Sequence, residues 1–385
     1  MNKFPHGFLV CGLGCTLALT ACSSDSDSGG GSTGGGSSGG AAGVSGGGAG
    51  GSAAGGSGGS SAGTTSSGGT STGGSAGSGG AGGAGGSAGS TSTTICDPNA
   101  SYGSPLPNDK TAQLVAGGYH FLEGPVWSTE LSVLFFSDIN FGAADSNGVP
   151  PSIIYRLPAG SSSPEVFIDT IGCNGNAIDQ NGFLVSCTHD TRSVSRIDPV
   201  TKQRTLIADK FEGKAFNSPN DAIVRSDGTI YFTDPSWQLG TRPAEIGFKG
   251  VYRIDPQGNV TLVSQGLMSP NGAALSPDEQ LLYVADDNTG NVHRFDVASD
   301  GTTSGGSVFV NVSGADGMAV DCAGNLYVTA QGGVRVFEPS GNELGTISVG
   351  EKPANTTFGG VDHTRLFVTA QTGLYAIDLL VPGLS

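Results

Sequence analysis

The sequence predicts an all-β fold, a six-bladed β-propeller with four-stranded blades, and three observations support this prediction. Six strand-like pentads share one pattern, aliphatic or aromatic residues followed by a small polar residue, and their last residues lie 49, 47, 52, 44 and 40 positions apart. A second strand with a related ending follows each pentad, as in IIYRLP, GVYRID and GLYAID. The repeats also have little helical periodicity. Short strands joined by hairpin turns and repeated about every 40 to 50 residues are typical of one blade per repeat.

Each repeat begins with a further apolar strand, which a turn rich in Gly, Asp, Asn and Pro joins to the pentad. The last repeat leaves too little chain for a fourth strand, whereas residues 111–118 are an unassigned strand before the first repeat. We therefore expect this N-terminal strand to complete the sixth blade and close the ring. A β-sandwich or jelly roll, the alternative fold, would not require six equivalent strand pairs. The pentads lie at residues 134–138, 183–187, 230–234, 282–286, 326–330 and 366–370.

The N-terminus has the features of a bacterial lipoprotein signal peptide over residues 1–21. Lys3 is followed by a short apolar run, and the segment LTAC ends at Cys22. A membrane-spanning helix, the alternative, would need about 20 apolar residues, whereas this run is shorter and contains glycines. We expect Cys22 to be lipidated in the cell envelope, with the protein periplasmic or surface-exposed. Ser23 after it favours an outer-membrane anchor over an inner-membrane one.

Residues 22–95 contain the lipidated cysteine and then a segment composed almost wholly of Gly, Ser, Ala and Thr. Such a segment has too little apolar surface to offset its chain entropy, so we expect a disordered tether. Its roughly 70 residues would have an r.m.s. length on the order of 45 to 50 Å. The propeller is expected to occupy residues 96–385, as a monomer that meets the membrane only through the lipid anchor.

Charge and cysteine content exclude several classes of partner and site. The formal net charge is −16, and the 17 Lys and Arg residues are scattered, which argues against nucleic acid and anionic lipid surfaces. No CxxC pair occurs, which removes the usual zinc signature. A disulfide is permitted in an exported protein, and Cys173 with Cys187 is the best candidate because the two could face each other across one hairpin.

A carboxylate or an amide stands at the start of every inner strand, 13 to 15 residues before the end of its pentad. The innermost strands of a propeller line its central channel, so six such side chains in phase would form a ring of oxygen ligands. Calcium binds about six to eight oxygens, and carboxylates with several amides would supply them. The alternative, that each residue only caps a turn, is less favoured for six equivalent positions. The residues are Glu123, Asn174, Asn220, Asn271, Asp316 and Asn355.

Several segments resemble the gluconolactonase branch of the SMP-30/gluconolactonase/LRE-like family, over about residues 115–380. They include FLEGPVW, NSPNDAIVRSDGTIYFTDPSW, SPNGAALSPDEQLLYVADD, DGMAVDCAGNLYVTAQGGVRVFEPSG and PANTTFGGVDHTRLFVTA. The resemblance implies a carboxylic ester hydrolase that opens a small lactone of a sugar acid or a related compound. It also implies one divalent cation at the channel mouth, with Ca²⁺ expected and Zn²⁺, Mg²⁺ or Mn²⁺ as the other candidates.

The resemblance further implies roles for individual residues. Glu123, Asn271 and Asp316 match the metal ligands of the family, and Asn220 matches a residue between metal and substrate that is also a candidate ligand. Asp316 matches the proposed general base, with metal-bound hydroxide as the alternative base. The further candidates for contact with the substrate are Asn174 and His189.

Two departures from the family leave the substrate open. Ser218 stands where some members have an arginine that holds substrate, and the segment SWQLGTRPAEIGFKG is shorter than the usual excursion at that point. Two other functions also stay open, a phosphotriesterase-like hydrolase and a non-catalytic surface binding propeller with structural calcium. None of the repeat strands leads into a Gly-x-Ser-x-Gly elbow, so serine hydrolysis has little support.

Overall fold

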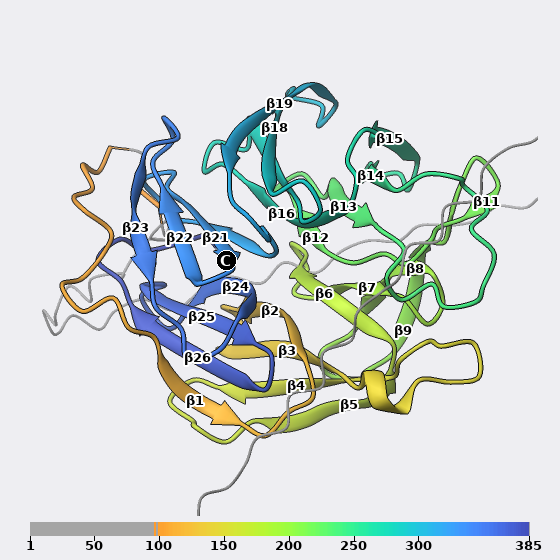
Figure 1. Cartoon of the computed structure of the whole chain (residues 1–385), viewed down its shortest axis with the longest axis horizontal. Coiled ribbons are helices and arrows are strands. Elements are labelled where there is room, and N and C mark those ends of the chain that lie inside the picture. The colour runs from red at the N-terminus through yellow and green to blue at the C-terminus, as the bar shows by residue number, and fades with distance from the viewer. Residues whose placement is uncertain (1–95, 98, 385) are drawn as a thin grey trace, which may run out of the picture. The chain divides into compact units, whose positions relative to one another are not determined.

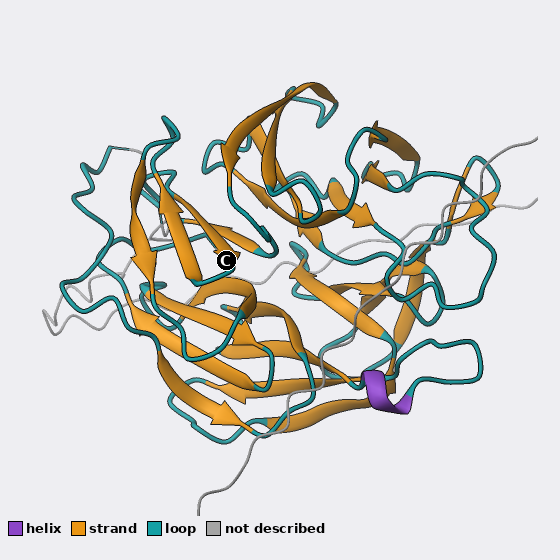
Figure 2. Cartoon of the chain, viewed as in Figure 1, coloured by secondary structure: helices purple, strands orange, loops and turns teal. Residues whose placement is uncertain are grey.

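The computed structural model of the chain describes residues 96, 97 and 99–384, and these form six four-stranded antiparallel sheets (Figure 1). Strands make up nearly all the regular structure, and one short 3-10 helix, η1 (Phe141–Ala143), stands beside them (Figure 2). Within this part of the chain, no helix is both long enough and apolar enough to cross a bilayer. The predicted signal peptide, the lipidation site Cys22 and the tether lie outside the described residues.

Each of the first three repeats forms one sheet, numbered here as blades 1 to 3 from the N-terminus. Blade 1 contains β2 (Leu122–Ser128), β3 (Val133–Ile139), β4 (Ser152–Pro158) and β5 (Glu165–Ile171). Blade 2 contains β6 (Cys173–Ile178), β7 (Leu184–Thr188), β8 (Ser193–Ile197) and β9 (Arg204–Ala208). Blade 3 contains β12 (Ala222–Val224), β13 (Ile230–Asp234), β14 (Gly250–Ile254) and β15 (Val260–Ser264), after a small hairpin of β10 (Lys210–Phe211) and β11 (Lys214–Ala215).

The second half of the chain repeats the arrangement in blades 4 to 6. Blade 4 contains β16 (Pro270–Leu275), β17 (Leu281–Asp286), β18 (Asn291–Val297) and β19 (Thr303–Asn311). Blade 5 contains β20 (Met318–Val320), β21 (Leu326–Ala330), β22 (Gly333–Phe337) and β23 (Glu343–Ile347). Blade 6 contains β24 (Pro353–Gly359), β25 (Arg365–Ala370), β26 (Gly373–Asp378) and, from the N-terminus, β1 (Gln113–Gly117).

The inner strands contact one another in a closed circuit, β2 to β6, β12, β16, β20, β24 and back to β2. Figure 1 shows the six sheets around one centre. The pairing of β1 with β26 confirms that the N-terminal strand completes the sixth blade. The predicted six-bladed propeller is therefore confirmed, and its channel is lined by the strands that carry the polar ring.

The repeated pentads supply the core because their side chains alternate between the two faces of each blade. In β13, Tyr231 belongs to the apolar cluster that contains Leu282 of blade 4, whereas the next residue, Phe232, belongs to the cluster that contains Cys187 of blade 2. Both aromatic rings are fully buried, and burial of each large apolar side chain contributes about 1.5 to 3 kcal/mol. One pentad thus stabilises two blade interfaces, which explains why its first three positions are apolar.

The predicted disulfide between Cys173 and Cys187 is wrong. Cys173 pairs across the β6–β7 ladder with Thr188, so Cys187 is one residue out of register and points to the opposite face of the sheet. Both remain free thiols, each buried in a different apolar cluster. The disulfide of the structure joins Cys96 to Cys322, two residues 226 positions apart.

The segment between Cys96 and β1 packs against blades 5 and 6. The amide of Leu380 donates to the carbonyl of Pro105 at 3.0 Å, and the amide of Ser348 donates to the carbonyl of Lys110 at 2.7 Å. Leu106 is buried in the apolar cluster that these two blades share. The disulfide, this segment and β1 together tie the first described residues to the last ones.

Candidate functional site

The six polar residues of the ring stand at or next to the starts of the inner strands, as the spacing predicts. All six side chains are buried, although each is carboxylate or amide. Buried polar groups of this kind need hydrogen-bond partners, ion partners or a bound cation, because desolvation without compensation costs several kcal/mol. They are Glu123 of β2, Asn174 of β6, Asn220 before β12, Asn271 of β16, Asp316 before β20 and Asn355 of β24.

A glycine follows four of these residues because the backbone of the next blade passes close by. A Cβ atom on Gly272 would collide with the carbonyl group of Asp316 in the neighbouring blade. Three of these glycines donate hydrogen bonds to the backbone of the next blade, which fixes the starts of neighbouring inner strands relative to each other. The pairs are Gly175 N to Asn220 O (2.6 Å), Gly272 N to Asp316 O (3.1 Å) and Gly317 N to Ala354 O (2.8 Å).

The acidic residues that end three pentads hold the loops that lead into the inner strands. Each carboxylate accepts hydrogen bonds from backbone amides of its own blade, at the turn before the polar ring. Aspartate is suited to this because its two oxygens accept from adjacent N–H groups. The contacts are Asp138 with His120 N (2.8 Å) and Phe121 N (3.0 Å), Asp234 with Asn217 N (2.8 Å), and Asp286 with Met268 N (2.9 Å) and Ser269 N (2.8 Å).

Glu123 and Asp316 lie close enough for their charges to interact, although 193 positions separate them in the chain (316 − 123). Burial, and then the charge of Asp221, raise the pKa of Glu123 to about 8. Burial, and then the charge of Glu123, raise the pKa of Asp316 well above its ordinary value. Asn355 opposes the effect by hydrogen bonding to the carboxyl groups of both Glu123 and Asp221. The fold therefore concentrates negative charge at this level of the channel.

Asp221 is a third buried carboxyl group at the site, and the sequence analysis missed it. Its Oδ2 accepts a hydrogen bond from the amide of Ala273 in the next blade at 3.0 Å. Burial raises its pKa to about 6. The available signal was that blade 3 carries Asn-Asp where four other blades carry a polar residue followed by Gly. Asn220 and Asp221 both precede β12, so strand alternation does not predict which way the side chain of Asp221 points. Its position at the site follows from the path of the folded backbone.

Asn271 is positioned between the acidic residues of its two neighbouring blades. The amide of the next residue, Gly272, bonds to Asp316, and the amide of Ala273 bonds to Asp221. Asn174 and Asn220 adjoin each other in the same way through Gly175. The structure thus brings the five predicted ring residues other than Asn355 to one level, and Asn355 joins them through its hydrogen bonds to Glu123.

The arrangement fits a cation that prefers oxygen ligands. The Oδ1 atoms of Asn174 and Asp316 are buried and have no hydrogen-bond partner among the described residues. Three mutually repelling carboxyl groups would also be stabilised by a dication. Among residues 96–384, no three His, Cys, Asp or Glu side chains are disposed to ligate a metal together, so the donors would have to combine carboxylates with amides. That combination is the one calcium accepts.

Lys352 is a basic residue at the site that the sequence analysis also missed. It is exposed on the loop before β24, and its charge lowers the pKa of both Glu123 and Asp316. The preceding residue fixes this loop, because the carboxylate of Glu351 accepts hydrogen bonds from the amide and the hydroxyl of Thr372 at 2.7 and 2.8 Å. The channel mouth therefore carries a positive charge on blade 6.

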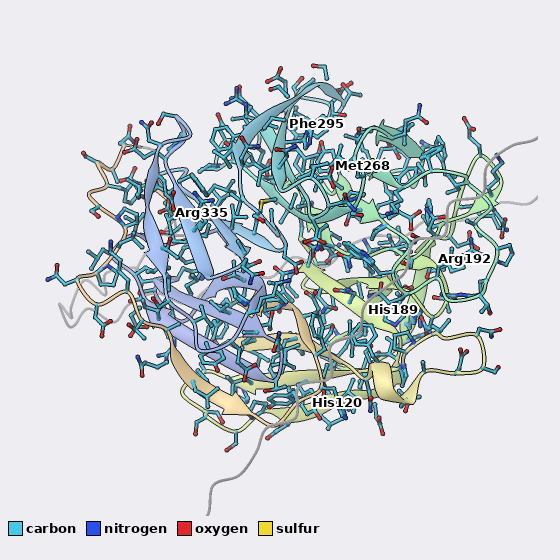
Figure 3. The ribbon with its side chains drawn as sticks, in the orientation of Figure 1. His120, His189, Arg192, Met268, Phe295 and Arg335 are labelled. Carbon is cyan, nitrogen blue, oxygen red and sulfur yellow. A yellow bond between two sulfur atoms is a disulfide. The ribbon has the colours of Figure 1, made fainter. Side chains whose placement is uncertain are left out.

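His189 lies apart from the carboxylates, beneath two loops that we call the canopy, residues 140–151 and 235–249. The loops join through the amide of Thr241 and the carbonyl of Asn147 at 2.7 Å, and Arg242 Nη1 donates to the carbonyl of Asp190 at 2.9 Å. His189 Nε2 contacts the carbonyl of Pro150 at 2.9 Å, while its Nδ1 has no partner among the described residues. Burial lowers its pKa to about 4, so the ring is neutral. Figure 3 labels His189 on the blade 2 side of the ring.

Beyond the polar ring, the channel continues as a cavity of about 390 Å³ between the inner strands. Asp221 and Asn355 border this cavity, and apolar residues such as Val126 and Met318 line its walls. Cys96 and Leu384, near the two ends of the described chain, also line it. The polar ring and the chain ends thus border one cavity, with the ring at the starts of the inner strands.

Comparisons with known proteins match the sequence and the fold of this chain. The family model described as the SMP-30/Gluconolactonase/LRE-like region matches residues 121–372, which include all six ring residues. A gluconolactonase of Zymomonas mobilis is 32% identical over 290 residues, covering 67% of this chain and 78% of the relative. A pentonolactonase of Haloferax volcanii is 27% identical over 262 residues, covering 65% of this chain and 81% of the relative.

A solved structure described as a gluconolactonase of Xanthomonas campestris has the same fold, with a TM-score of 0.62 and 29% sequence identity. The superposition covers 74% of this chain and 99% of that chain. The repeats, the six-bladed ring and these matches agree, and the chain belongs to the SMP-30/Gluconolactonase/LRE-like family.

Proposed function

We propose that the protein is a metal-dependent hydrolase that opens a small lactone at the polar end of its channel. The observation that carries the proposal is that the buried carboxyl groups of Glu123 and Asp316 lie close enough to interact, beside buried amide side chains. The relatives named as lactonases support the reaction class, since one of them matches over 78% of its own length. The substrate class we propose is a lactone of a sugar acid or a related compound.

Glu123, Asn271 and Asp316 would hold the cation, with Asn220 as a fourth ligand. Bound there, a divalent cation, Ca²⁺ by the nature of its oxygen donors, would polarise the lactone carbonyl and stabilise the negative charge that develops on it. Asp316 has one carboxylate oxygen without a protein partner, so it can accept a proton from the attacking water. Asp221 and Asn355 would keep Glu123 in position from the side of the cavity.

Asn174, Asn220 and His189 would orient the substrate. The unpartnered Oδ1 of Asn174 accepts hydrogen bonds, which suits the hydroxyl groups of a sugar lactone. Neutral His189 can make one further hydrogen bond through Nδ1. Because burial holds its pKa near 4, we propose an orienting role for it rather than that of a cationic acid.

We also propose that the protein is exported and anchored in the cell envelope through Cys22, as a monomer that needs no macromolecular partner. The disulfide between Cys96 and Cys322 supports this placement, because disulfides persist in oxidising compartments. Incorporation of a labelled fatty acid into the wild-type chain, lost in Cys22→Ala, would test the anchor.

The first prediction concerns turnover of a lactone panel by the purified protein. Proton release from aldonolactones should be catalysed by the metal-loaded protein, abolished by chelation and restored by Ca²⁺. The physical reason is that the carbonyl oxygen needs a positive partner in the transition state, which this carboxylate and amide cluster cannot provide alone. A pH-stat or an indicator assay would measure the rates.

The same assay separates the competing functions. Metal-restorable turnover of a phosphotriester without turnover of any lactone would favour the phosphotriesterase alternative. Calcium binding without turnover of any lactone, ester or phosphotriester would favour a binding propeller with a structural metal, and the hydrolase proposal would fail. A Glu123→Gln variant is the matched control for metal dependence, since it keeps the side-chain shape but removes one ligand charge.

The second prediction is that the stability of the metal-free protein depends on pH and that bound metal weakens this dependence. Folding raises the pKa of Glu123 from 4.5 to about 8, so the folded state binds its proton more tightly than the unfolded state. This contribution to stability is fully present below about pH 4.5 and is lost as the pH rises through about 8. The melting temperature of the metal-free protein should therefore fall across this window, and Ca²⁺ should reduce the fall.

Thermal unfolding between pH 5 and pH 9 with chelator or with Ca²⁺ would measure this effect. Glu123→Gln should flatten the metal-free profile, whereas part of the slope remains because burial also raises the pKa of Asp234, to about 7. A wild-type profile that is flat without metal would show that the carboxyl groups do not repel one another as the structure indicates.

A further inference from the structure

Lys352 is a basic side chain at the channel mouth that the described structure leaves without a fixed partner. None of the ion pairs or side-chain hydrogen bonds recorded for residues 96–384 includes it, whereas Glu351 beside it is held by Thr372. It is exposed, and the rigid inner strand β24 begins at the next residue, Pro353. Its backbone is therefore fixed while its ammonium group stays free to move over the site.

Three other basic residues on this side of the propeller, Lys249, Arg242 and Arg192, are engaged. Lys249 Nζ donates to the hydroxyl of Ser269 at 3.0 Å. Arg242 donates to backbone carbonyls of the canopy, and Arg192 pairs with Glu245 at 3.2 Å. Residue 218 on blade 3 is a serine, so no cation comes from that position. Lys352 has no such partner among the described residues, and it stands on blade 6, between the blades of Glu123 and Asp316.

Hydrolysis of a lactone needs two places where negative charge is stabilised. Water adds to the carbonyl carbon, which places charge on the carbonyl oxygen, and the bond from that carbon to the ring oxygen then breaks. The ring oxygen leaves as an alkoxide on the same molecule and takes a proton from solvent, while the proton of water passes to the base. Ionised carboxylates accept hydrogen bonds but donate none, and Asp316 becomes a donor only after it has taken the proton of water. A group that carries its donors throughout can stabilise the leaving oxygen without waiting for that transfer.

We propose that Lys352 donates a hydrogen bond to the ring oxygen as its bond to the carbonyl carbon breaks. This role rests on the proposed lactone hydrolysis and adds a residue to it. An ammonium group carries three donors and a full charge, and charge-assisted hydrogen bonds are about twice as strong as neutral ones. Lys352 can reach the polar ring because it directly precedes β24, the inner strand that carries Asn355.

The test compares two lactones that differ in their leaving oxygen. For an aliphatic δ-lactone, which leaves as an alkoxide, Lys352→Met should lower kcat by about 100- to 1,000-fold, the range for losing one donor to developing charge. For an aryl lactone, which leaves as a stable phenoxide, the same variant should lose less than about threefold, because little charge needs a partner. Lys352→Arg, which keeps charge and donors, should restore most of the aliphatic rate.

Lys202→Met is the matched control, because Lys202 is an exposed lysine in the turn between β8 and β9, at the other end of the strands. It should leave both rates unchanged. An equal loss on both lactones, or a change in KM alone, would overturn the role of Lys352 and leave the lactonase proposal standing. Absence of metal-restorable turnover by the wild type on either lactone would instead overturn both proposals.

Discussion

Replacing Asp316 with asparagine should lower lactone turnover by about 100- to 10,000-fold, the range for a lost general base. The substitution preserves shape and the backbone contact, since Gly272 bonds to the carbonyl oxygen of residue 316 rather than to its side chain. It removes the free carboxylate oxygen that would accept the proton of water. Initial rates at saturating lactone and saturating Ca²⁺ would measure the loss.

The same variant should be more stable than the wild type when metal is absent. Burial and the charge of Glu123 disfavour the ionised form of Asp316, so a neutral amide at this position relieves a repulsion. Loss of activity together with a higher melting temperature would separate a chemical role from misfolding. Asp287→Asn is the control, because Asp287 is a neighbouring acid outside the proposed ligand set. Near-normal turnover by Asp316→Asn with metal bound would rule out Asp316 as the base.

Breaking the disulfide with Cys322→Ser should cause the largest loss of stability among the substitutions discussed. Cys96 and Cys322 close a loop of 226 positions, and a chain-entropy treatment assigns about 5 kcal/mol to a loop of that length. A measured loss of roughly 3 to 5 kcal/mol would lower the melting temperature on the order of 10 °C. Differential scanning calorimetry of the oxidised protein would give this value.

The controls for this prediction use the chain's own cysteines. Cys96→Ser and the double variant should match Cys322→Ser, because all three remove the same bond. Reducing agent should destabilise the wild type to the same extent and should leave the variants unaffected. If the single variants melted with the wild type, the bond would add nothing to stability, and β1 alone would hold the ring closed.

The blades could be predicted because their signal is repeated and local. The residue pattern of each pentad predicts one β-strand, and six copies at a regular spacing are compatible with few other architectures. The ring of six polar residues followed from the same spacing, since equivalent positions in equivalent blades must meet around the channel, whereas the choice of Glu123, Asn271 and Asp316 as ligands came from the family resemblance. The glycines that follow four of the ring residues mark the same positions, because a side chain there would collide with the next blade.

The features that escaped prediction depend on contacts that no repeat specifies. Cys96 bonds to Cys322 only because the closed ring brings these distant residues together. Cys173 and Cys187 were predicted to pair, but the β6–β7 register places them one residue apart and on opposite faces of the sheet. Asp221 reaches the site because the amide of Ala273, in another blade, holds its carboxylate. The canopy over His189 joins two irregular loops, for which strand periodicity gives no rule.

Closure of the ring by β1 and β26 has a consequence for how the chain matures. Blades 1 to 5 each use consecutive segments and can pair as the chain emerges, but blade 6 needs the first strand and the last one together. Until the final residues arrive, β1 keeps an unpaired edge, and such edges invite aggregation or capture by quality-control factors. A chain that ends before β26 therefore leaves the edge of its first strand exposed.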